Sequence, residues 1–423
     1  MLQIHYIREN AEEIIEKLKR RNLDAREWVE EALDLDKKRR EAQTKLDQTL
    51  AESNKASKEI GNLFKSGQKE AATALREKMA AMKGEVKGMQ EGLQKLQEEL
   101  HEVLTHIPNV PNDLVPEGKS DQDNLEIFSQ GKVEKSPENA MPHWELAEKY
   151  KLINFELGTK ITGAGFPVYT GKGARLQRAL IQFFLDYNTE AGYEEIIPPH
   201  LVNEASGFGT GQLPDKEGQM YHVTGDNLYL IPTAEVPVTN LLRDEILNQS
   251  DLPIKFTAYT PCFRREAGSY GKDVRGLNRL HQFDKVEIVQ VRHPDESYQA
   301  LEEMVEHVKG ILEALELPYR IVRLCGGDLG FTSALTYDFE VWSQAQERWL
   351  EVSSVSNFEA FQSNRLKLRF RGSEKSTQLC HTLNGSALAL PRILAALLEN
   401  NQTEDGILIP KALQTYTKFE KID

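Results

Sequence analysis

Residues 263–287 have the sequence FRREAGSYGKDVRGLNRLHQFDKVE, and this stretch decides the fold class. Its two ends have the composition of β-strands, and the glycine-rich polar stretch between them predicts a hairpin with a long loop. Side chains alternate between the two faces of a strand. Arg264 and Glu266 are therefore predicted to share one face, and Phe283 and Glu287 to line the same site from the returning strand.

Such a combination of side chains suits a site for a charged nucleotide. A guanidinium is planar and permanently charged, so Arg264 suits a phosphate or carboxylate group. A nearby carboxylate such as Glu266 can orient the arginine, and the Phe283 ring offers a surface for stacking. Each feature alone is common, because Arg-x-Glu is most often a surface ion pair and a single phenylalanine most often belongs to a core.

The remainder of the C-terminal part predicts an α+β domain. β-rich runs at 228–231, 283–291 and 349–355 are mixed with helical patterns at 172–188, 296–315 and 391–399. No regular alternation of strand and helix emerges, so a mainly antiparallel sheet flanked by helices is expected.

The N-terminal quarter shows a sustained heptad pattern, which predicts an antiparallel hairpin of two long helices with a break at Ser66-Gly67-Gln68. The narrow apolar seam favours a projecting arm rather than part of a compact fold. The seam positions are Ala42, Leu46, Thr49, Ser53, Ala56, Ile60 and Leu63 on the first helix, and Leu75, Met79, Met82, Val86, Met89, Leu93, Leu96, Leu100 and Val103 on the second.

Charge distribution indicates where RNA could bind. The 423-residue chain has a formal net charge of -14, so contact with nucleic acid must be local. Residues 52–87, in the distal half of the predicted hairpin, contain eight basic and five acidic residues. A charge run is usually a solvated helix face, but its place on an arm favours RNA contact.

The chain length predicts two domains. We expect an N-terminal domain at 1–105, a proline-rich linker and lead-in at 106–138, and a C-terminal domain at 139–423. The N-terminus lacks a basic, apolar leader, and no run of about 18 apolar residues occurs, so a cytoplasmic protein is expected.

Over nearly its whole length the sequence resembles the bacterial-type seryl-tRNA synthetases, a family within the class II aminoacyl-tRNA synthetases. Residues 263–287 are similar to the second signature motif of that class, GYEEIIPPHLVN at 192–203 to the first, and NGSALALPRILAALLEN at 384–400 to the third. The N-terminal hairpin resembles the family's tRNA-binding arm. The resemblance implies the class II fold, a homodimer with its interface at 192–199, and ATP-dependent joining of serine to tRNA.

The resemblance also implies roles for individual residues. Arg264, Glu266 and Arg392 would be catalytic, with Phe283 under the adenine, Arg392 on its opposite face, and Glu351 and Ser354 on Mg²⁺. ATP would be bound by Arg264, Arg265, Glu266, Phe283, Glu351, Val352, Ser353, Ser354 and Arg392. Serine would be bound by Thr233, Ala234, Glu235, Arg264, Glu287, Asn384 and Ser386.

Local geometry adds expectations that a structure can check. A regular strand would send Glu351 and Ser354 to opposite faces, so the chain is expected to bend or end there. Thr233 and Glu235 share a face if the chain is extended. Pro391 suits the first position of a helix, which puts Arg392 in its first turn. The loop at 267–280, with Lys272 and Arg275, is expected to contact the acceptor end of tRNA.

Three alternatives remain to be weighed. An enzyme of this fold that loads a small amino acid onto a carrier protein would lack the long arm. A class II enzyme for threonine or proline is disfavoured by Glu287 and by Asn384-Gly385-Ser386. A scaffold with an inactive catalytic domain would have lost Arg264, Glu351 or Arg392. The sequence leaves open whether selenocysteine tRNA is also a substrate.

Overall fold

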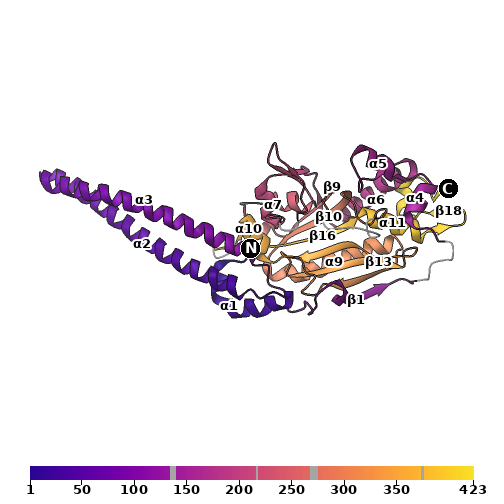
Figure 1. Cartoon of the computed structure of the whole chain (residues 1–423), viewed down its shortest axis with the longest axis horizontal. Helices are drawn as coiled ribbons and strands as arrows, with labels where there is room; N and C mark the ends of the chain where they lie inside the picture. Colours follow the sequence, from indigo (N-terminus) through magenta and orange to yellow (C-terminus); the bar gives the residue numbers. More distant parts are fainter. Residues whose placement is uncertain (134–139, 216–217, 267–274, 373–375) are drawn as a thin grey trace. The chain divides into compact units, whose positions relative to one another are not determined.

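The structure is a computed structural model that describes residues 1–133, 140–215, 218–266, 275–372 and 376–423 (Figure 1). These residues divide into two compact units. The first contains Met1–Lys19 and Leu23–Pro108, and the second contains Arg20–Asn22 and Asn109–Asp423.

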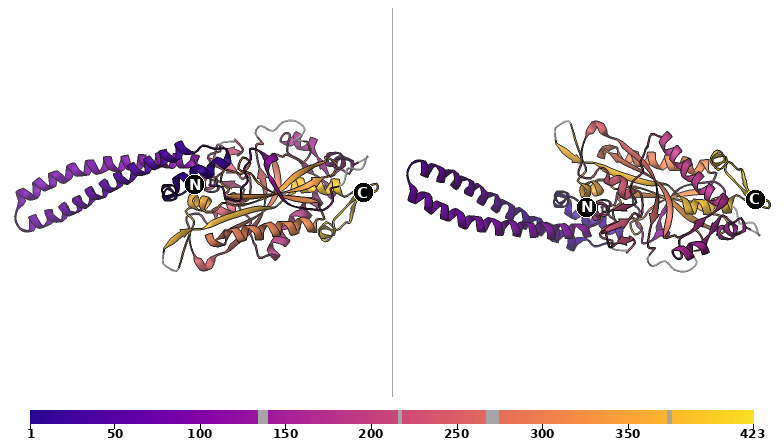
Figure 2. Two further views of the ribbon diagram at one scale, coloured as in Figure 1. Left: turned by 90° about the horizontal axis from the view of Figure 1, so that it is seen from below. Right: turned by 90° about the horizontal axis from the view of Figure 1, so that it is seen from above.

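The first unit is helical and is dominated by one hairpin (Figure 2). Its helices are α1 (Ile4–Leu18), α2 (Arg26–Lys65) and α3 (Lys69–His106). At about 1.5 Å per residue, α2 and α3 are each roughly 60 Å long. The turn between them places Gly67 at φ 79°, a left-handed conformation that glycine adopts without a steric cost. The predicted break at residues 66–68 is confirmed.

Burial along the hairpin follows the predicted seam. Every seam position is buried or half-buried, with Leu46 and Leu93 among the most buried, while most positions between them are exposed. The heptad pattern therefore identified the side chains that hold α2 against α3.

An eight-stranded sheet forms the centre of the second unit (Figure 1). Neighbouring strands are antiparallel except for the last pair, which is parallel. In the order in which they pair, the strands are β1 (Leu125–Gln130), β11 (Tyr319–Arg323), β12 (Leu335–Ser343), β13 (Arg348–Asn357), β16 (His381–Ala389), β10 (Gln282–Arg292), β9 (Ile254–Phe263) and β4 (Glu194–Glu195).

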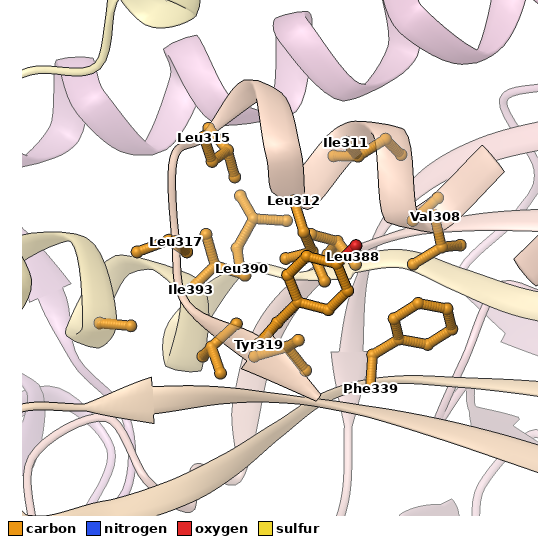
Figure 3. Close-up of a cluster of buried hydrophobic side chains, with 14 of the residues drawn as sticks. Val308, Ile311, Leu312, Leu315, Leu317, Tyr319, Phe339, Leu388, Leu390 and Ile393 are labelled. Atoms are coloured by element: carbon orange, nitrogen blue, oxygen red, sulfur yellow. The ribbon is translucent and has the colours of Figure 1, made fainter. Parts of the chain in front are cut away.

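Helices cover one face of this sheet and bury a large apolar core against it (Figure 3). Val308, Ile311 and Leu312 of helix α9 (Ser297–Ala314) meet Phe339 of β12 there. Helices α6 (Gly171–Glu190), α11 (Leu390–Asn400) and α12 (Lys411–Thr417) contribute further apolar side chains to the same core.

Short elements surround the main sheet. The helices are α4 (His143–Lys149), α5 (Phe155–Ile161), α7 (Glu204–Thr210), α8 (Glu235–Asn240) and α10 (Ala360–Leu366). The strands are β2 (Ile153–Asn154), β3 (Val168–Tyr169), β5 (Leu201–Val202), β6 (His222–Val223), β7 (Leu228–Leu230), β8 (Ile246–Asn248), β14 (Arg369–Arg371), β15 (Thr377–Leu379), β17 (Gln402–Thr403), β18 (Gly406–Leu408) and β19 (Lys421–Ile422). Within the described ranges, no helix has the length and apolarity needed to cross a membrane.

The predicted fold class is confirmed, and the predicted strands and helices each match an observed element within two residues. One segment differs from its expectation. Residues 125–130, expected to belong to the linker, form β1 and pair with β11 at the edge of the main sheet. The proline-rich segment therefore supplies a strand as well as a connection.

The core gives a direct test of the packing. Leu312 has no exposed surface, so Leu312→Ala removes buried methyl groups and is expected to lower the free energy of unfolding by about 2–5 kcal/mol. Leu408, which is 50% exposed, is a matched control whose replacement by alanine should cost under about 1 kcal/mol. Urea denaturation measures both variants, and equal losses would contradict this description of the core.

Candidate active site

Polar side chains gather on the sheet face opposite the apolar core. In β10, Val286 and Ile288 belong to the core, so the alternating Lys285 and Glu287 point to the other face. Strand pairing places Ser386 of β16 directly opposite Glu287. Two neighbouring strands thus present charged and polar groups on one surface.

Arg264 lies at the end of β9 beside Phe283. Its guanidinium carbon is 5.3 Å from the centre of the Phe283 ring, and its Nε donates to the carbonyl of Pro232 at 3.4 Å. The Arg264 amide also donates to the carbonyl of His281 at 3.0 Å, which extends the hairpin by one residue beyond the strand. The predicted meeting of Arg264 and Phe283 is confirmed.

Glu266 does not share a strand face with Arg264, and that part of the prediction was wrong. Strand β9 ends at Phe263, and Glu266 has φ 49°, so strand alternation no longer applies. Its carboxylate pairs with Arg279 at 3.0 Å. Arg265 is exposed, and its amide donates to the carbonyl of Gln219.

Glu287 sits in a buried polar cluster at the centre of this face. Its carboxylate pairs with the Lys285 ammonium at 2.7 Å, and both side chains are under 10% exposed. The Thr233 hydroxyl donates to the same Glu287 oxygen at 3.1 Å. An ion pair this deeply buried is costly to break on one side only, so the two charges hold each other in place.

Glu235 supplies a second buried carboxylate close to Glu287. It receives a hydrogen bond of 2.6 Å from Gln362, whose own carbonyl accepts one of 2.7 Å from Thr382. Burial raises the pKa of Glu235 to about 7, and the negative charge of Glu287 adds to the shift. The chain at Thr233 and Glu235 is not extended, because Glu235 is the first residue of α8, so the condition for a shared strand face is not met.

The remaining predicted serine-binding residues lie nearby. Ala234 is fully buried immediately before α8. Asn384 and Ser386 are buried on β16, and their strand partners on β10 are Val289 and Glu287. Since paired residues share a face, both side chains lie on the surface that carries Glu287.

A β-bulge brings Glu351 and Ser354 to the same face, as the expected bend requires. Phe339 of β12 pairs with Ser353, but the next residue, Glu340, pairs with Glu351. The extra residue, Val352, packs into the core, so Glu351 and Ser354 both lie opposite same-face residues of β12. The Ser353 hydroxyl donates to the carbonyl of Ser386 at 2.6 Å. The side chains of Val352 and Ser353 are therefore buried, and only their backbone could contact a ligand on this face.

Asp338 lies across from Ser354 and has a side-chain hydrogen bond with it. Burial raises the pKa of Asp338 well above its ordinary value, and the charge of Glu351 adds to the shift. One of its carboxylate oxygens, Oδ1, is buried without a hydrogen-bond partner. A buried acceptor of this kind suits a cationic or protonated neighbour.

Arg392 connects α11 to this acidic region. Helix α11 begins at Leu390, one residue before the expected start, and Arg392 remains in its first turn. Its guanidinium donates to the carbonyl of Glu351 at 2.8 Å and lies 3.6 Å from the Glu351 carboxylate. Its Nε donates to the carbonyl of Asn278 at 3.1 Å.

Part of the predicted tRNA-contacting loop can be placed. Lys272 lies outside the described residues. Arg275 stacks on the Trp144 ring at 4.7 Å, whereas Leu277 and Leu280 are buried. Residues 276–280 are thus tied into the domain rather than freely exposed.

Sequence reasoning missed Lys285, Gln362 and Asp338. Lys285 is two residues before Glu287, so strand alternation would have placed it on the same face. In the same way, Asp338 is two residues before Glu340 and shares its face. Gln362 carried no local signal, because it reaches Glu235 from a helix 127 residues away in sequence.

Comparison with known proteins agrees with this geometry. A family model described as the seryl-tRNA synthetase N-terminal domain matches residues 1–111, and one described as the tRNA synthetase class II core domain (G, H, P, S and T) matches residues 221–401. A protein of Salinibacter ruber named serine–tRNA ligase is 50% identical over 424 residues, covering 100% of this chain and 99% of the relative. The chain belongs to the seryl-tRNA synthetase family.

Further members of the seryl-tRNA synthetase family are similar over the same span. A serine–tRNA ligase of Chlorobaculum parvum is 47% identical and covers 100% of both chains. The crystal structure of seryl-tRNA synthetase from Pyrococcus horikoshii complexed with ATP matches with a TM-score of 0.92 and 35% identity, covering 100% of this chain and 99% of that one. The prolyl-tRNA synthetase of Giardia lamblia, at 15% identity and a TM-score of 0.56, shares the fold alone.

Glu235 makes the stability of the protein depend on pH. Because its pKa rises from an ordinary 4.5 to about 7, the folded protein holds a proton there that the unfolded chain releases, so stability falls as pH increases from 4.5 through 7. Glu235→Gln is expected to raise the free energy of unfolding at pH 8 by on the order of 2 kcal/mol, with little change near pH 4.5. Denaturation at both pH values measures this. The exposed Glu404→Gln serves as the control, and a gain no larger than in that control would contradict the assignment.

Proposed function

We propose that this polar face activates serine with ATP and passes it to tRNA, the reaction of the family to which the chain belongs. The proposal rests on one observation: the same face of the sheet carries a group suited to a nucleotide and a group suited to an amino acid. Arg264 stacked beside Phe283 suits a nucleotide, and the buried cluster around Glu287 suits a small polar amino acid. A site of this kind brings two substrates together in a fixed geometry.

The nucleotide half would lie at the Phe283 end of the site. Arg264 would bind the α-phosphate of ATP together with the serine carboxylate, because its planar fork can contact both groups. Phe283 would stack beneath the adenine, and Arg392 would cover the opposite face of the base. Glu266, now paired with Arg279, would accept from the nucleotide.

Glu351 and Ser354 would hold the Mg²⁺ that accompanies ATP. Proteins commonly bind Mg²⁺ through one or two carboxylates together with substrate phosphates, which fits the two oxygen groups brought to one face by the bulge. The unpartnered, buried Oδ1 of Asp338 beside Ser354 also suits a nearby cation. When bound, Mg²⁺ would offset the negative charge that develops on the phosphates.

The amino-acid half would be formed by Thr233, Glu235 and Glu287. Two buried carboxylates can accept from the ammonium and hydroxyl groups of serine, and the bound ammonium would offset their mutual repulsion. Alanine lacks the hydroxyl and would leave a buried acceptor unpaired, which penalises its binding. Threonine keeps the hydroxyl and would be excluded by size among the buried side chains of this pocket.

The reaction needs no protein nucleophile. A serine carboxylate oxygen attacks the α-phosphorus of ATP, a new oxygen–phosphorus bond forms, and pyrophosphate leaves. A ribose hydroxyl at the 3′-terminal adenosine of tRNA then attacks the seryl carbonyl carbon, and AMP leaves. The protein would act by positioning these groups and by stabilising charge, with Arg264 facing the phosphorus centre.

The helical hairpin would bind the tRNA. Structured RNA is recognised largely by shape and backbone, with lysine and arginine on phosphates. The eight basic residues at 52–87 all have exposed side chains: Lys55, Lys58, Lys65, Lys69, Arg76, Lys78, Lys83 and Lys87. We therefore assign tRNA binding to the domain at 1–105 and catalysis to the domain at 139–423, with Arg275 beside the acceptor end.

We further propose that the protein acts as a homodimer in the cytoplasm. Residues 192–199 include the edge strand β4 and Ile197, whose side chain is 85% exposed. An exposed isoleucine beside a sheet edge suits burial against a second copy. The cytoplasmic assignment rests on the family to which the chain belongs.

Replacing Arg264 tests the nucleotide site. Arg264→Ala should reduce kcat/KM in serine-dependent ATP–pyrophosphate exchange by roughly a hundredfold or more, because one preorganised donor to the transition state is lost. Arg178→Ala, at an exposed position on α6, is the matched control and should exchange normally. Near-normal exchange in Arg264→Ala would refute the role given to this residue.

Removing the distal hairpin tests the assignment of tRNA binding. Residues 42–93 can be replaced by a short Gly-Ser link, because the two cut points face each other across the hairpin. The shortened protein should form seryl-adenylate at the normal rate and lose charging of tRNA, since the catalytic unit is intact and the phosphate contacts are gone. Charging that survives the deletion would contradict the role of the arm.

A further inference from the structure

A histidine outside the polar face is buried against a carboxylate near the far end of α11. The side chains of His143 and Glu399 have no exposed surface, and the Nδ1 atom of His143 lies 2.7 Å from a Glu399 oxygen. The His143 amide donates to that oxygen at 2.9 Å, and the Ser343 hydroxyl donates to the other one. Burial opposes the charge of Glu399, but the hydrogen bonds from His143 and Ser343 outweigh it and lower the pKa of the carboxyl.

The other nitrogen of His143 holds the backbone of the segment that follows residue 275. The amide of Leu277 donates to Nε2 at 2.8 Å, so Nε2 carries no proton and Nδ1 donates to Glu399. Gly276 packs against the same ring, where a Cβ atom would lie 2.2 Å from Nε2, and its φ is 66°. The ring and the peptide are therefore fitted to each other.

This contact leads directly to Arg392. The next residue, Asn278, accepts from the Nε of Arg392 at 3.1 Å through its backbone carbonyl. The Asn278 side chain donates to Gln346 at 2.9 Å, and Gln346 in turn donates to Glu399 at 3.1 Å. Helix α11 thus carries Arg392 in its first turn and, near its end, the carboxylate that orients His143.

We propose that His143 is a positioning residue for ATP: by accepting the Leu277 amide it fixes the Asn278 carbonyl, which holds the Arg392 guanidinium in the orientation needed to cover the adenine. The inference rests on the ATP role proposed above for Arg392. His143 touches no substrate and acts only through the backbone of residues 277–278. Its effect should appear in ATP binding and leave serine binding unchanged.

Two substitutions of His143 test the roles of its two ring nitrogens separately. The amide of asparagine can replace the donor at Nδ1 and leaves the Leu277 amide unpaired, whereas the longer glutamine can place an acceptor near Nε2. His143→Asn should raise the KM for ATP in serine-dependent exchange about tenfold, the effect of one lost buried hydrogen bond. The KM for serine should not change, and His143→Gln should restore most of the ATP affinity.

Hydrogen exchange gives a readout independent of activity. The Leu277 amide should exchange faster in His143→Asn than in the wild type and stay protected in His143→Gln. His307→Asn is the matched control. This half-buried histidine on α9 forms a hydrogen bond of 2.7 Å with Asn188. Its replacement should alter neither the exchange of the Leu277 amide nor the KM for ATP. If His143→Asn fails to fold, Gly276→Ala provides the test, because its Cβ would lie 2.2 Å from Nε2 and would push the ring away from the Leu277 amide. It too should raise the KM for ATP alone.

The outcomes distinguish this inference from the proposed function. Unchanged Leu277 exchange in His143→Asn, an unchanged KM for ATP, or equal increases in the KM for ATP and for serine would each overturn the inference. Arg392→Ala is measured in parallel. If it leaves the KM for ATP unchanged, the ATP role of Arg392 fails; if it raises that KM while His143→Asn does not, only the positioning role of His143 fails.

Discussion

The structure of the second unit depends on the alternation of side chains along β10 and its two neighbours. One set of alternate residues, including Val286 and Ile288, is committed to the core beneath α9 and α11. The other set is left for Lys285 and Glu287. Packing on one face therefore fixes the positions of charged groups on the other, to within the small movements that a close-packed interior permits. A shift of one residue in strand pairing would exchange the two faces and destroy both.

Several carboxyl groups lie close together on the polar face of the sheet. Burial raises the pKa of Glu235 and the nearby charge of Glu287 adds to the shift, and burial and the charge of Glu351 do the same for the pKa of Asp338. Lys285 pairs with the Glu287 carboxylate. A cationic group placed beside these carboxyl groups would favour their charged forms.

Much of the fold followed from periodicity, and the exceptions have physical causes. The heptad seam of α2 and α3 was predicted residue by residue, because a two-helix hairpin is determined by local spacing. Alternation likewise placed Phe283 and Glu287. It failed at Glu266, where the strand ends, and it does not apply at Glu235, which begins a helix. A bend or an end of the strand was expected near Val352 only because the family resemblance gives Glu351 and Ser354 a common role. A regular strand would send these two side chains to opposite faces. Contacts such as Gln362 with Glu235 depend on tertiary structure, and no local pattern reports them.

Because the apolar seam of the hairpin is regular, the hairpin can change in length without loss of the contacts between its two helices. Each helix gains about 10 Å for every seven residues added, and a heptad inserted into both helices keeps every seam position facing its partner. An insertion far from a whole number of turns, such as two or five residues, would rotate the apolar stripe out of the interface. The length of the hairpin can therefore change during evolution in discrete steps while the sheet and its polar face stay the same.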